Sequence, residues 1–121
     1  MRAVSAIRRV RRTLLGLLGG LALGSLIVEI LVRVIERVLS PREIEVLAAD
    51  LSSCSGPEEA FEVLSGFDGL EWTWDLWELI SDCSSVSDWL DVLEWLNEVP
   101  EVDFDVFDLI PDLDLDIDLD F

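Results

Sequence analysis

Two cysteines, Cys54 and Cys83, are the residues of this chain best suited to redox or nucleophilic chemistry, because histidine, lysine and tyrosine are absent. The pair permits one disulfide, but two thiolates without histidine do not complete a zinc site unless other ligands join them. The 26 acidic residues make close carboxylate pairs unavoidable, so such pairs do not indicate a glycosidase. The sequence also lacks a phosphate-binding loop, a dinucleotide fingerprint and a nucleophile elbow. We therefore predict that the protein is not an enzyme and has no catalytic residue, cofactor or metal site.

The charges are divided between two regions of the chain. Residues 1–42 contain all eight arginines and two acids, a net charge of +6. Residues 43–121 contain 24 acids and no basic residue, and the whole chain carries −18. The acidic region repels phosphates, so we exclude nucleic acid as its partner. Apolar residues directly follow the basic ones, and this order favours a lipid bilayer as the partner of the N-terminal region.

The apolar run lies at residues 13–32, TLLGLLGGLALGSLIVEILV. About 20 apolar residues are needed to cross a bilayer core of ~30 Å, which this run matches. Gly16, Gly20 and Gly24 recur at every fourth position, a spacing typical of helices that pack closely in membranes. We predict a single-pass membrane helix over residues 13–39 that forms homo-oligomers through these glycines. Five arginines precede the run and three follow it, which favours an N-terminus on the inner side.

Two alternatives remain for this segment. The first is a cleaved signal peptide of an exported protein, with a basic stretch at 8–12, an apolar stretch at 14–21 and small residues at 22–24 before Ser25. The apolar character continues beyond Ser25, which argues against cleavage. The second is an amphipathic or soluble core helix. Glu29, Arg33, Glu36 and Arg37 form one charged stripe on an otherwise apolar helix over 27–39, and we expect Glu29 to pair with Arg33.

Residues 40–99 predict an acidic module of four short helices. Ser40 begins a capping box that opens a helix to about residue 51. Pro57 opens a second helix, which ends near residue 66. Asp68 is expected to cap a third helix over 70–80. A second capping box at Ser85 opens the last helix, over 89–99, which Pro100 ends.

All five tryptophans lie between residues 72 and 95, interleaved with acids. One interpretation is that they form the core of a small helical bundle. The stretches DLWELI (75–80) and SDWLDVLEWL (87–96) also resemble acidic transactivation segments of eukaryotic and viral transcription activators. The resemblance implies apolar anchors that enter a groove of a partner protein. The candidate partner-binding residues are Leu76, Trp77, Ile80, Trp89, Leu93 and Leu96.

Residues 100–121 are predicted to form a disordered acidic tail. In its last part, DLDLDIDLDF (112–121), aspartates alternate with apolar residues. The D-x-D-x-D spacing is similar to that of a calcium loop, but the glycine at the sixth position and the glutamate at the twelfth are missing. We therefore predict no calcium site in the tail.

Together these patterns predict an all-α protein with a basic flank (1–12), a transmembrane or membrane-associated helix (13–39), an acidic Trp-rich module (40–99) and a tail (100–121). The predicted function is membrane anchoring combined with binding of a protein partner by the Trp- and Leu-rich helices. The alternatives are a soluble, nuclear regulator that binds transcription machinery, an exported protein with a cleaved signal, and an acidic protein adapted to high salt. An exported acidic region would allow Cys54 and Cys83 to form a disulfide.

Overall fold

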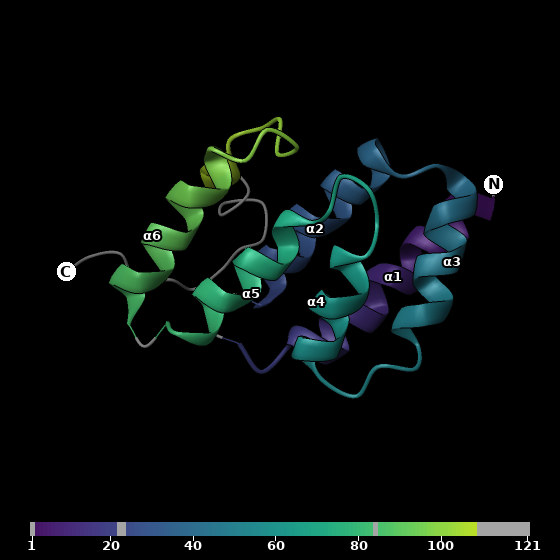
Figure 1. The fold of residues 1–121 in the computed structure, drawn as a ribbon, viewed down its shortest axis with the longest axis horizontal. Helices are drawn as coiled ribbons and strands as arrows, with labels where there is room; N and C mark the ends of the chain where they lie inside the picture. The colour runs from purple at the N-terminus through teal and green to yellow at the C-terminus, as the bar shows by residue number, and fades with distance from the viewer. Residues whose placement is uncertain (1, 22–23, 84, 109–121) are drawn as a thin grey trace.

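The computed structural model describes residues 2–21, 24–83 and 85–108. Six α-helices and one short 3₁₀ helix make up the regular structure of these residues (Figure 1). They are α1 (Arg2–Leu18), α2 (Gly24–Val38), α3 (Pro41–Leu51), α4 (Pro57–Ser65), α5 (Trp72–Ser81), α6 (Val86–Asn97) and η1 (Val106–Asp108). No strand occurs in the described part of the chain, and the predicted all-α fold is confirmed.

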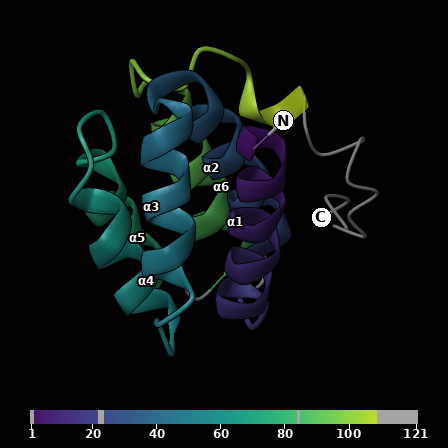
Figure 2. The ribbon, with the colours of Figure 1, turned by 90° about the vertical axis from the view of Figure 1, so that its right-hand side faces the viewer.

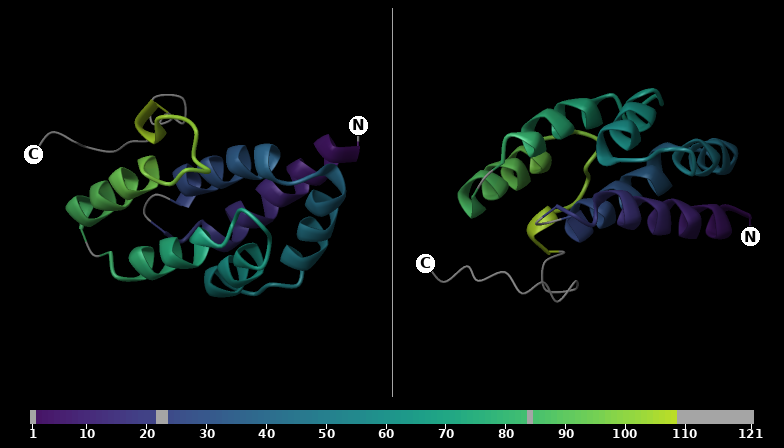
Figure 3. Two further views of the ribbon diagram at one scale, coloured as in Figure 1. Left: turned by 45° about the horizontal axis from the view of Figure 1, so that its top comes forward. Right: turned by 90° about the horizontal axis from the view of Figure 1, so that it is seen from below.

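The helices form two layers, which are best seen in the right-hand view of Figure 3. One layer consists of α1 and α2, and the other consists of α4, α5 and α6. α3 packs against both α1 and α4 and so joins the two layers at one end. The basic N-terminal region therefore lies largely in one layer, and most of the acidic region lies in the other.

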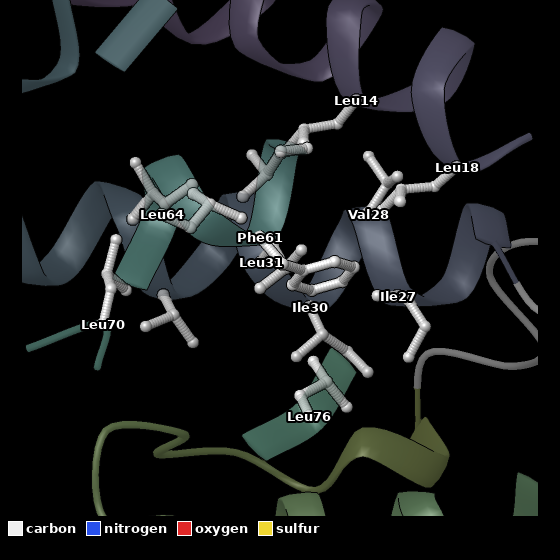
Figure 4. Packing of buried hydrophobic residues seen from close by; sticks show 14 of the residues in the cluster. Leu14, Leu18, Ile27, Val28, Ile30, Leu31, Phe61, Leu64, Leu70 and Leu76 are labelled. Atoms are coloured by element: carbon white, nitrogen blue, oxygen red, sulfur yellow. The ribbon is translucent and has the colours of Figure 1, made fainter. Parts of the chain in front are cut away.

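α2 is the central helix, with other helices around it in each view (Figures 1 and 2). Most of its residues are buried, and only Arg33, Glu36 and Arg37 are exposed. A helix that is apolar on nearly all sides has to be buried in a protein core or in lipid. Here the protein itself covers it. Figure 4 shows Phe61 and Leu76, from the opposite layer, lying toward the apolar side chains of α2.

The apolar run 13–32 does not form one helix, so the predicted continuous helix over 13–39 is wrong. α1 ends at Leu18, α2 begins at Gly24, and the two helices pack against each other as an antiparallel pair (Figure 3). A side chain at position 24 would overlap the carbonyl oxygen of Leu18, so the close approach of the two helix ends requires glycine.

Among the described residues, no helix combines the length and the apolar character needed to cross a bilayer.

The predicted boundaries of the acidic helices are mostly confirmed. The hydroxyl of Ser40 accepts a hydrogen bond from the backbone N–H of Glu43, and the Glu43 carboxylate accepts one from the N–H of Ser40. The hydroxyl of Ser85 caps α6 by accepting a hydrogen bond from the backbone N–H of Asp88. Asp68 does not cap α5, which begins at Trp72. The short loop before α5 contains Gly69 with a φ of 90°, and a side chain there would overlap Val38 of α2.

Residues 100–108, predicted as the start of a disordered tail, pack against the helices instead. Val102 and Val106 are buried, and the side-chain oxygen of Asn97 accepts a hydrogen bond from the Val106 N–H at 2.9 Å. Asp103 pairs with Arg37 of α2 at 3.0 Å. The rest of the predicted tail, 109–121, lies outside the described residues.

Candidate functional site

The three glycines predicted to form a helix-packing face do not share one helix. Gly16 lies in α1 and Gly20 in the turn after it, and both are exposed with open space where a side chain would stand. Gly24 is buried at the start of α2. The three glycines therefore do not form one packing face, because the turn between α1 and α2 separates Gly16 from Gly24.

The six predicted partner-binding residues lie in or against the core. Five of them are buried, namely Leu76, Ile80, Trp89, Leu93 and Leu96. Trp77 is half-buried and stacks on Phe61, with ring centroids 5.6 Å apart and an interplanar angle of 22°. Binding of a partner by these side chains would require the helices to separate. The folded protein therefore does not present these six side chains together as one open surface.

Both cysteines are free thiols in the structure, and the disulfide expected for an exported protein stays a prediction. Each follows the end of a different helix and donates its thiol hydrogen to that helix: Cys54 to Asp50 O at 3.6 Å, and Cys83 to Leu79 O at 3.3 Å. Partial burial raises the pKa of each thiol, and nearby carboxylates raise it further. Neither thiol is therefore activated as a nucleophile.

We expect Cys54 and Cys83 to react with iodoacetamide more slowly at pH 7 than the thiol of a short neutral peptide, because the thiolate is the reactive form and both pKa values are raised. Raising the salt from about 0.05 to about 1 M should accelerate both reactions, because salt screens the nearby carboxylates. Mass spectrometry of the native protein gives the two rates. Rates equal to that of the peptide would contradict this prediction. Reaction of the two cysteines only after a reductant is added would show that they form a disulfide in the native protein.

The exposed side of α1 is the strongest candidate for a binding surface. One side of α1 belongs to the core, because the buried residues of this helix recur at every fourth position: Ala6, Val10, Leu14 and Leu18. The opposite side consists of exposed residues that we call the α1 outer face: Arg8, Arg9, Arg12 and Leu15. Leu15 is 42% exposed, one of the few large apolar side chains of the described residues that face solvent.

A shallow groove runs beside the α1 outer face, between α1 and α2. It measures about 230 Å³ and contains Arg11, Leu15, Val28 and Glu29. Arg11 Nη2 lies 3.4 Å from the buried Oε2 of Glu29 and links the two helices. The expected pair of Glu29 with Arg33 is replaced by this contact, and the Arg33 guanidinium lies over the ring of Phe104 instead, 6.0 Å from its centroid.

Within the described ranges, no group of three or more histidine, cysteine, aspartate or glutamate side chains is placed to hold a metal ion. Comparison of the chain with protein-family models, with curated proteins and with solved structures finds no match.

Proposed function

We propose that the protein is a non-enzymatic membrane-surface protein that binds anionic lipid through the α1 outer face and holds its acidic helices away from the lipid. The observation that carries this proposal is the separation of charge between the two layers. Three exposed arginines and an exposed leucine lie on α1. This helix lies at one edge of the molecule (Figure 2). The acidic helices α4, α5 and α6 lie in the other layer.

Helices that rest on a membrane surface combine basic and apolar side chains on the side that faces the lipid. Each arginine near an anionic surface contributes about 1 kcal/mol, so Arg8, Arg9 and Arg12 together contribute about 3 kcal/mol. Arg11 is engaged by Glu29 and adds less. Leu15 adds a small apolar contribution, because only the exposed 42% of the residue can be transferred from water to lipid. The resulting attachment is weak and reversible, which suits a peripheral protein rather than an anchored one.

The large negative charge of the chain opposes binding, and distance decides how strongly it does so. Electrostatic interactions are screened over ~8 Å at physiological ionic strength. A helix with its side chains is about 10 Å across, so the acidic layer of α4, α5 and α6 lies beyond one screening length when α1 rests on the lipid. The three acids of α3 lie closer, because α3 packs against α1. The attraction of the α1 outer face then exceeds the repulsion of the acidic layer at physiological salt. At low salt the repulsion reaches further and works against binding.

The experiment compares vesicles of phosphatidylserine and phosphatidylcholine with vesicles of pure phosphatidylcholine, using sedimentation of the full chain at about 0.15 M salt. We expect binding to the anionic vesicles and little binding to the neutral ones. The triple variant Arg8→Gln, Arg9→Gln, Arg12→Gln should bind on the order of a hundredfold more weakly, because about 3 kcal/mol is removed.

The matched control is a pair of single variants that each remove one positive charge. Arg12→Gln, on the α1 outer face, should weaken binding about fivefold. Arg42→Gln, at an exposed position of α3, should leave binding nearly unchanged. Equal losses in the two variants would mean that net charge and not the α1 outer face determines binding, and the proposal would be rejected. Equal binding of the protein to the two kinds of vesicle would also reject it.

A further inference from the structure

A second groove lies on the layer of α4, α5 and α6, between the end of α5 and one side of α6. It measures about 230 Å³ and its apolar walls are formed by Leu79, Val92 and Trp95. Leu79 is 39% exposed. Trp95 is half-buried and contacts Trp72, with ring centroids 6.4 Å apart, so its indole is held in place. The groove therefore offers a preformed apolar surface to a partner.

All charged residues that line this groove are acidic, and we call them its rim. Asp82, Asp88 and Asp91 line it, and no basic residue occurs in the sequence after Arg42. A further negative contribution comes from α5, whose carbonyl end carries the negative pole of the helix dipole. Basic side chains usually occupy such a helix end, but the last turn of α5 has none and Asp82 is its C-cap. The dipole and the carboxylates therefore act together on the same opening.

From these contacts we infer that the groove between α5 and α6 binds a cationic amphipathic segment of a partner protein. An apolar side chain of the partner would lie against Leu79 and Trp95, and an adjacent arginine or lysine would reach the aspartates of the rim. Helices that dock in grooves use this combination of an apolar anchor and flanking charge. The inferred groove uses different residues from the buried Trp and Leu side chains that the sequence suggests, and the fold need not open.

This inference does not depend on membrane association, because the test contains no lipid. The probe is a fluorescein-labelled peptide of sequence Leu-Arg-Arg-Leu-Leu-Arg-Arg-Leu, and its anisotropy is followed as the full chain is added. The double variant Asp82→Asn, Asp91→Asn should bind the peptide at least about tenfold more weakly. Leu79→Ser, which changes an exposed side chain, should also weaken binding.

The control has to separate the groove from the overall negative charge. The double variant Asp50→Asn, Asp68→Asn also removes two negative charges, but at exposed positions of α3 and of the loop before α5. We expect this variant to lose less than about threefold in affinity. Equal losses in the two double variants, or no binding of the peptide at all, would overturn the inference.

A second measurement needs no variant. Cys83 lies in the groove, whereas Cys54 lies in a different hollow beside Glu59 and Glu62, and both thiols are half-buried with raised pKa values. Bound peptide should slow the alkylation of Cys83 severalfold and leave that of Cys54 unchanged. Equal slowing of both alkylation reactions would contradict a specific groove.

The protein could also bind a second copy of itself in this groove. Self-association would then occur without peptide and disappear in the Asp82→Asn, Asp91→Asn variant. That result would overturn the assignment of a foreign partner.

Discussion

Phe61→Ala should lower the free energy of unfolding by about 3–5 kcal/mol. The Phe61 side chain is fully buried, lies between α2 and α5, and stacks on Trp77 (Figure 4). Its removal leaves a cavity at the contact between the two layers, where the neighbouring helices cannot close without disturbing each other. Because a small domain has a total stability of about 5–15 kcal/mol, this single change removes a large share of it. Urea denaturation followed by circular dichroism measures the loss.

The control for this variant is Leu15→Ala, which truncates an exposed side chain of α1. We expect a change within about 0.5 kcal/mol, since surface substitutions rarely cost more. A stability of Phe61→Ala within about 1 kcal/mol of the unaltered protein would show that the two layers do not pack around this ring. Both variants should be measured at the same salt concentration, because the acidic chain repels itself less strongly when it is screened.

Gly24→Ala should destabilise the protein by about 3 kcal/mol or more, while Gly16→Ala should stabilise it by about 1 kcal/mol. A methyl group at position 24 overlaps the backbone oxygen of Leu18, and a backbone atom cannot rotate aside as a side chain can. At position 16 there is open space, and alanine is a better helix former than glycine in this last turn of α1. Thermal or urea denaturation of the two variants provides the comparison.

The opposite signs of the two expected stability changes distinguish this fold from a single membrane helix. In a continuous helix that packs through its glycines, both substitutions would weaken the same interface. In the helical pair observed here, only Gly24 is at a close contact and Gly16 faces solvent. Destabilisation of similar size in both variants would contradict the turn between α1 and α2. A neutral result for Gly24→Ala would do the same.

Local sequence features predict local structure well in this chain. The capping residues Ser40 and Ser85 and the helix-opening Pro57 identify three of the acidic helices, because a cap depends on residues within one turn. The run 13–32 is misleading because an all-apolar helix has the same pattern in a protein core and in a bilayer. What decides between them is whether later helices cover the run, and no residue within it contains that information.

The candidate surfaces are harder to predict than the helices. Glu29 has Arg33 one turn away in sequence, but the antiparallel packing of α1 and α2 brings Arg11 to it instead. The sequence identifies the acidic Trp-rich segments as helices but does not divide their apolar residues into core and surface. Leu79 and Trp95 come together at the surface only when α5 and α6 pair. The exposed side of α1 is predictable in principle, because the four-residue spacing of its buried positions leaves the arginines on the opposite side.

The ribosome makes α2 before it makes the helices of the acidic layer that cover it. Roughly 70 residues separate the end of α2 from η1, and at ~5–20 residues per second they take about 4–14 s to appear. During that interval the nascent chain carries an apolar segment preceded by arginines, a pattern typical of signal segments. Slower translation beyond residue 38 would lengthen the time for which this segment lacks the helices that cover it in the folded protein.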